Sequence, residues 1–140
     1  MAIRAETRAR ALALQLLYAW DQLPERAGDP SALWAGVLPL VRASAAVRER
    51  ALDLAAGTVG ARARLDAALE SAADRWRVER LAVVDRNVLR LAVFELEAAA
   101  TPPKVVIDEA VRLARWFGGP KSPAFVNGIL DRVARDRGRL

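Results

Sequence analysis

The apolar residues of this chain recur at the three- and four-residue spacing of an amphipathic helix, and no stretch alternates at period two for long enough to form a sheet. The spacing is clearest near the N-terminus, where Leu12, Leu16 and Trp20 share one face of a helix predicted near residues 3–22. The opposite face of this helix is polar or aromatic, with Arg4, Thr7, Arg8, Gln15 and Tyr18. Proline and glycine divide the remaining pattern into further helical segments. The sequence therefore predicts an all-α fold, with six or seven helices packed in one bundle.

Local signals place the other helices. They are predicted at residues 31–40, 45–75, 81–99, 103–117 and 122–137. Ser31 is expected to cap the first of these through its side chain. Gly57 and Gly60 weaken the middle of the long second segment, which is expected to form one helix or two. The fourth segment places Asp108 and Arg112 at i,i+4 spacing, which predicts a modest surface ion pair.

The length of 140 residues suits one domain, predicted to span residues 1–140, because folding at this size buries roughly two-thirds of the surface of the unfolded chain. No linker or internal repeat divides the sequence. Apolar stretches are shorter than the roughly 18 residues of a membrane span, and charged residues near the N-terminus interrupt the apolar core that a signal peptide needs. We therefore expect a cytoplasmic protein.

The chain contains no cysteine and no histidine, which excludes zinc fingers, thiol nucleophiles, Ser-His-Asp triads and imidazole bases. The carboxylates of Glu95 and Glu97 point to different helix faces, so they do not form an acid–base pair. The run from Gly118 to Ser122 ends like a phosphate-binding loop, but Pro120 replaces a required glycine and no strand precedes it. We predict a protein that is not an enzyme and that binds no metal ion or other cofactor.

Positive charge is concentrated at the two ends of the chain. The 22 basic residues exceed the 17 acidic residues by five. Residues 1–10 contribute Arg4, Arg8 and Arg10 against a single acid, and residues 119–140 hold the rest of the excess. If the fold brings the ends together, they form the basic patch typical of a protein that binds nucleic acid. The alternative is a pair of solvated basic tails.

Phe125 stands out in the last predicted helix. It falls at the edge of the apolar arc, on the side that carries Arg132 one heptad later, so its ring is expected to be partly exposed. An exposed aromatic ring beside cations at a helix start can stack on an unpaired base. A peripheral core phenylalanine is the alternative. Trp76, between Arg75 and Arg77, is expected to be a packing anchor rather than a base platform.

Four sequence blocks together resemble the NusB family of bacterial transcription antitermination factors. They follow one another in the family's order and span nearly the whole chain. The blocks are RARAL at 8–12 leading to LLYAWD at 16–21, DRNVLRLA at 85–92 with Glu95-Leu96, PKVVIDEAV at 103–111 through Phe117-Gly118, and FVNGILD at 125–131.

The resemblance implies an all-helical fold of two sub-bundles and a non-catalytic protein. In this family the protein pairs with the ribosomal protein NusE, binds boxA-like single-stranded RNA and joins an antitermination complex on RNA polymerase, notably in ribosomal RNA operons. Carried over, the RNA-binding residues are Arg4, Arg8, Arg10, Gln15, Lys121, Ser122 and Phe125. The protein-partner surface is expected at the start of the central helix, with Trp76, Glu79, Asp85 and Arg86.

Two other functions are compatible with an all-helical chain of this kind. NusB-like domains also form the N-terminus of RsmB-type ribosomal RNA cytosine methyltransferases, but such an enzyme needs an α/β cofactor domain and catalytic cysteines that this sequence lacks. A helical protein-interaction module without an RNA role is the third possibility, and its expected sign is no RNA binding at any salt concentration.

Overall fold

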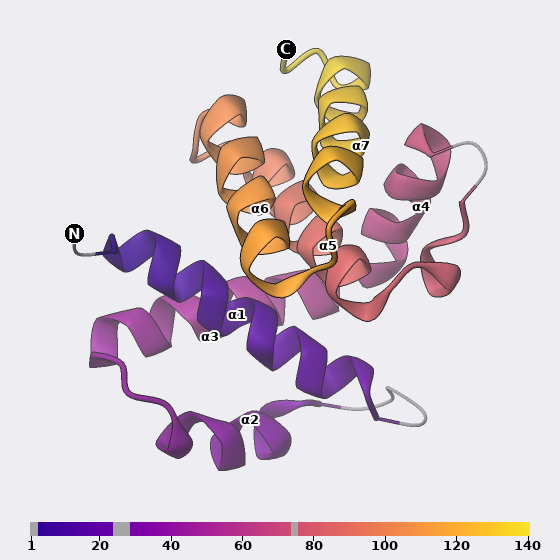
Figure 1. The fold of residues 1–140 in the computed structure, drawn as a ribbon. Coiled ribbons are helices and arrows are strands. Elements are labelled where there is room, and N and C mark those ends of the chain that lie inside the picture. The colour runs from indigo at the N-terminus through magenta and orange to yellow at the C-terminus, as the bar shows by residue number, and fades with distance from the viewer. Residues whose placement is uncertain (1–2, 24–28, 74–75) are drawn as a thin grey trace. The chain divides into compact units, whose positions relative to one another are not determined.

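The computed structural model describes residues 3–23, 29–73 and 76–140, which contain seven α-helices, two short 3-10 helices and no strand (Figure 1). The prediction of an all-α fold is therefore confirmed. The elements are α1 (Ala5–Asp21), α2 (Ser31–Val37), η1 (Leu38–Leu40), α3 (Ala45–Gly60), α4 (Arg62–Ala72), η2 (Val78–Arg80), α5 (Val83–Ala98), α6 (Pro103–Phe117) and α7 (Ser122–Asp136).

The chain forms two compact units, residues 1–59 and residues 60–140. The first holds α1, α2 and nearly all of α3, and the second holds α4 to α7. Two units agree with the two sub-bundles that the resemblance implies, whereas a single domain over residues 1–140 stays a prediction.

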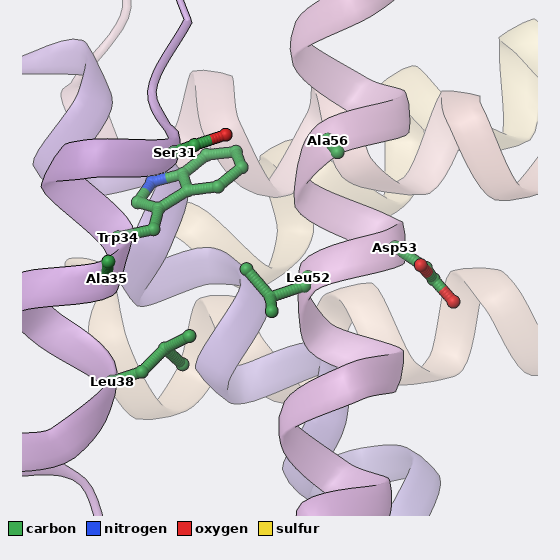
Figure 2. Close-up of a pocket in the computed structure, with 7 residues that line it drawn as sticks. All are labelled: Ser31, Trp34, Ala35, Leu38, Leu52, Asp53 and Ala56. Carbon is green, nitrogen blue, oxygen red and sulfur yellow. The ribbon is translucent and has the colours of Figure 1, made fainter.

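In the first unit, α1 and α2 are held together by a buried tryptophan. The indole nitrogen of Trp34 donates a hydrogen bond of 2.9 Å to the carbonyl oxygen of Leu16, so its one polar atom is satisfied inside the core. A groove of about 340 Å³ lies between α2 and α3. Figure 2 shows Leu52 of α3 directed toward α2 and Asp53 directed away from it.

The start of α2 differs from the sequence-based expectation. Ser31 is not the cap but the first helical residue, and the carboxylate of Asp29 accepts hydrogen bonds from the Ser31 backbone N–H at 3.0 Å and from its hydroxyl at 2.6 Å. These two bonds hold the pKa of Asp29 below its ordinary value. The expected helix over 31–40 ends as an α-helix at Val37 and continues as η1, which contains Pro39.

The long segment predicted at 45–75 forms two helices. α3 ends at Gly60, and α4 begins after Ala61, whose backbone leaves the helical region. Glycine at this point lowers the cost of the interruption. The sequence left open whether this segment forms one helix or two, and the structure has two.

The second unit is built around α5. This helix contacts α4, α6 and α7, and most of its residues from Asn87 to Leu96 are buried, as expected for the central helix. α6 and α7 run antiparallel beside each other, joined by a short turn (Figure 1). The predicted pair between Asp108 and Arg112 is wrong, because Arg112 instead approaches Glu109 at 3.5 Å, one residue closer along the helix.

Among the described residues, no helix combines the length and the apolar character needed to cross a membrane.

Candidate nucleic-acid interface

One face of α1 presents polar and aromatic side chains to solvent. Arg4 lies at the N-cap position, and Arg8, Gln15 and Tyr18 follow at helical spacing, all of them exposed. The first turn is closed by a backbone hydrogen bond of 3.0 Å from Arg8 to the carbonyl of Arg4. Three of the predicted RNA-binding residues are therefore brought onto one accessible stripe.

Tyr18 belongs to this stripe but is not among the predicted RNA-binding residues. Its side chain is 46% exposed. The signal that could have found it is its spacing, since Tyr18 follows Arg4 by two heptads and Ala11 by one. An aromatic ring with an accessible face suits contact with a base.

Arg10 does not lie on the exposed stripe. It is 3% exposed, with its guanidinium 3.9 Å from the carboxylate of Glu6. It belongs to a second buried stripe of α1, whose members are Thr7, Arg10, Leu14, Leu17 and Asp21. A buried guanidinium is unsuited to direct phosphate contact, so the burial of Arg10 does not favour the predicted RNA role. The expected place of Thr7 on the polar face is likewise wrong.

The turn between α6 and α7 holds the second predicted set. Lys121 is exposed, but Ser122 is buried, and its hydroxyl oxygen accepts a hydrogen bond of 3.0 Å from the backbone N–H of Gly119. Gly118 is packed so closely that an added Cβ would lie 2.6 Å from that hydroxyl and 2.7 Å from the carbonyl of Ala114. Ser122 therefore shapes the turn, whereas Lys121 faces solvent.

Phe125 lies one turn into α7 and is partly buried, as its position at the edge of the apolar arc predicts. Its ring meets the indole of Trp76 edge to face, with centroids 5.8 Å apart and planes inclined by 79°. Trp76 itself is 53% exposed. Trp76 thus packs against a ring while half of its own surface stays exposed, and the contact joins one residue of the predicted RNA set to one residue of the predicted partner set.

The remaining partner residues surround the connection from α4 to α5. Glu79 is exposed, and Arg77 approaches its carboxylate at 3.7 Å. Arg86 donates hydrogen bonds to the carbonyl oxygens of Glu79 and Leu81 at 3.3 and 3.2 Å, so it fixes the connection. Asp85 is partly buried in the first turn of α5, and its Oδ1 finds no hydrogen-bond donor among the described residues.

The predicted RNA-binding residues thus fall into two groups. Arg4, Arg8 and Gln15 share the stripe on the first unit, and Lys121 and Phe125 lie at the start of α7 on the second. Within the parts of the chain that the structure describes, no three His, Cys, Asp or Glu side chains are grouped to hold a metal ion. Each group combines cationic and aromatic side chains, with Tyr18 on the stripe and Phe125 on α7, and such side chains suit binding to an unpaired polyanionic strand.

Comparison with known proteins identifies the family. The model of the NusB family matches residues 7–135. A transcription antitermination protein NusB from Anaeromyxobacter dehalogenans is 46% identical over 129 residues, covering 91% of this chain and 89% of that protein. The NusB of Sorangium cellulosum is 39% identical and covers 97% and 96% of the two chains.

Solved structures agree with this assignment. A T. maritima NusB superposes with a TM-score of 0.82 at 31% identity, covering 97% of this chain and 94% of that one. A crystal structure of the antitermination factors NusB and NusE in complex with dsRNA gives a TM-score of 0.80 at 29% identity, with coverage of 96% and 99%. On the family match and these relatives, the chain belongs to the NusB family.

Proposed function

We propose that this protein is a transcription antitermination factor that pairs with ribosomal protein NusE and binds boxA-type nascent RNA, supporting antitermination of ribosomal RNA operons. The observation that carries the proposal is the exposed stripe of Arg4, Arg8 and Gln15 on α1 in a chain of this family. The similarity of the whole chain to a NusB whose structure was solved with NusE and dsRNA supports the same function. Such a factor acts in the cytoplasm, in a complex with RNA polymerase.

The RNA contacts divide by chemistry. Arg4 and Arg8, together with Lys121, attract the phosphates, because exposed cations displace the counterions that are condensed on the RNA. Tyr18 and Phe125 offer ring faces to unpaired bases, and base stacking tolerates different sequences. The side-chain amide of Gln15 can both donate a hydrogen bond to a base edge and accept one from it. Arg10 and Ser122 are buried, and Ser122 contributes by shaping the turn before α7.

The partner surface lies at the connection from α4 to α5, with Trp76, Glu79, Asp85 and Arg86. Two of these four are carboxylates, which suits a basic protein such as a ribosomal protein. Arg86 contributes by fixing the backbone of the connection through its two carbonyl contacts. The proposed role involves no chemical step, so the protein acts by binding rather than by catalysis.

The test is RNA titration of the purified protein, alone and after assembly with NusE, at several salt concentrations. We expect weak binding of a boxA-like strand by the protein alone and tighter binding by the pair, because two basic surfaces then share one RNA. The matched control is a scrambled strand of the same composition. Equal affinity for both strands, with and without NusE, would contradict the proposed function.

A further inference from the structure

The connection after α4 holds Trp76 in a defined place. The backbone N–H of Trp76 donates a 2.7 Å hydrogen bond to the carbonyl of Ala73, next to the end of α4. Two residues later, the N–H of Val78 donates to the carboxylate of Glu70 at 3.1 Å, and the Val78 side chain is buried. The backbone is therefore hydrogen-bonded at Trp76 and again at Val78, while the indole itself is exposed.

The backbone of Phe125 is held in the first turn of α7, but its ring is only partly buried. The backbone N–H donates to the carbonyl of Lys121 at 3.2 Å. A ring at the edge of an apolar arc can adopt more than one staggered rotamer. The edge-to-face contact with Trp76, at 5.8 Å and 79°, has the preferred geometry of an aromatic pair and selects one of these orientations.

We propose that Trp76 is a positioning residue for RNA recognition: it holds the Phe125 ring in the orientation that stacks on a base. The inference rests on the proposed function and deepens it, because it assigns Trp76 a role in RNA binding that its place in the partner surface does not require. The free protein, without NusE, must already show this effect. A base that stacks on Phe125 then meets a ring whose orientation is set before binding, which lowers the entropic cost of association.

Alternative explanations make different predictions. If Trp76 serves only the protein partner, its removal weakens NusE binding and leaves the RNA affinity of the free protein unchanged. If Trp76 stacks on a second base independently of Phe125, the losses from removing the two rings add in free energy. If it positions Phe125, its removal has no further effect once the Phe125 ring is gone.

The experiment is a double-mutant cycle on the free protein with a fluorescently labelled boxA-like strand. The variants are Trp76→Ala, Phe125→Ala, the double variant and Trp76→Phe, with Trp116→Ala as the control, because Trp116 is another exposed indole that meets a different ring, that of Phe117. Circular dichroism confirms that each is folded. NusE association is measured separately for every variant.

We expect Phe125→Ala to weaken RNA binding by roughly 5-fold to 150-fold, the range for loss of one stacked base. Trp76→Ala should weaken it by about twofold to tenfold, the range for an aromatic pair. Trp76→Phe should restore most of the affinity, and the double variant should bind no more weakly than Phe125→Ala alone. The positioning role would be overturned if Phe125→Ala weakened RNA binding in the expected range while Trp76→Ala left the RNA affinity unchanged. It would also be overturned if the losses of binding free energy in the two single variants added up in the double variant. Unchanged RNA affinity in Phe125→Ala would instead overturn the proposed RNA contact itself.

Discussion

Arg90 of α5 and Asp66 of α4 form an ion pair with two hydrogen bonds, from Nε to Oδ1 at 2.8 Å and from Nη2 to Oδ2 at 3.1 Å. The Arg90 side chain is 2% exposed, and its Nη1 donates to Oδ1 of Asn87 at 3.1 Å. A buried guanidinium needs such partners, because an unpaired charge in the core is costly. The pair therefore joins α4 to the central helix of the unit that carries Phe125.

Asp66→Ala should lower the free energy of unfolding by about 3 kcal/mol, because it leaves the Arg90 charge buried without its carboxylate. Urea denaturation followed by circular dichroism measures the loss. The matched control is Asp131→Ala, which breaks the exposed i,i+4 pair with Arg135 on α7. That pair is solvated, so the denaturation midpoint should barely move. Equal shifts in both variants would contradict a structural role for the Arg90 pair.

Arg4→Ala and Arg8→Ala should each reduce the steepness of the salt dependence of RNA binding. Removing one cation that neutralises a single-stranded phosphate lowers the log–log slope by roughly 0.7. Filter binding of a boxA-like strand at several salt concentrations gives the slopes. Arg42→Ala, an exposed arginine of the same unit outside the α1 stripe, should leave the slope unchanged. A slope that falls only in Arg42→Ala would move the RNA site away from α1.

The periodicity of apolar residues is enough to predict the helices, because each helix has at least one buried face. What it does not resolve is how many faces are buried. Leu14 fits neither the Leu12–Leu16 face nor the polar stripe, and the structure places it on a second buried stripe with Thr7 and Arg10. A sequence does not state which neighbour covers such a stripe, so the burial of Arg10 could not be predicted from its type.

Short-range contacts explain the other differences. The N-cap residue of α2 is Pro30, and the side chain that accepts a hydrogen bond at this helix start is Asp29, two residues before the predicted Ser31. Both Asp and Ser side chains can bond to nearby backbone N–H groups, and the backbone path decides which of them does so. A serine hydroxyl can contact a phosphate, but the hydroxyl oxygen of Ser122 accepts a hydrogen bond from the backbone N–H of Gly119. The contact between Trp76 and Phe125 joins residues far apart in the sequence, and no local pattern predicts it.

The carboxylate of Asp29 should titrate below its ordinary pKa of 3.8, because the hydrogen bonds from Ser31 favour the charged form. The lowered pKa makes folding stability depend on pH. The charged Asp29 stabilises the folded state at pH values above the pKa of the unfolded chain, and this contribution is lost as the pH falls through the pKa of the folded state. The Ser31 amide resonance in a pH titration by NMR reports the change directly. In Asp29→Asn this titration should disappear. A midpoint at or above the ordinary value would contradict the hydrogen bonds at this helix start.

Asp85→Lys should weaken association with NusE, because it reverses a carboxylate on the surface proposed for a basic partner. The free energy of unfolding should fall by about 1–2 kcal/mol, because a stabilising acid in the first turn of α5 is replaced by a cation at the same helix end. A pull-down measures association, and thermal melting measures stability. Asp108→Lys on the exposed face of α6 is the matched charge reversal and should keep both properties. Loss of the helical signal in Asp85→Lys would make Asp85 a structural residue instead.

Gly118 and Gly119 are adjacent but should respond oppositely to an added methyl group. A Cβ at Gly118 would lie 2.7 Å from the backbone carbonyl of Ala114 and equally close to the Cβ of Ser122, and neither atom can move without shifting a helix. The φ of Gly118 is −97°, so the restriction comes from packing and not from backbone conformation.

Gly118→Ala should therefore destabilise the protein by about 1–3 kcal/mol, the usual cost of overpacking. It should also displace the Ser122 hydroxyl from the Gly119 N–H and so shift the start of α7, which carries Lys121 and Phe125. In Gly119→Ala the nearest atom is 4.0 Å away, so unfolding and RNA affinity should stay close to those of the parent chain. Urea denaturation and RNA titration of both variants measure the difference. Equal behaviour of the two variants would show that the close packing at Gly118 does not set the turn before α7.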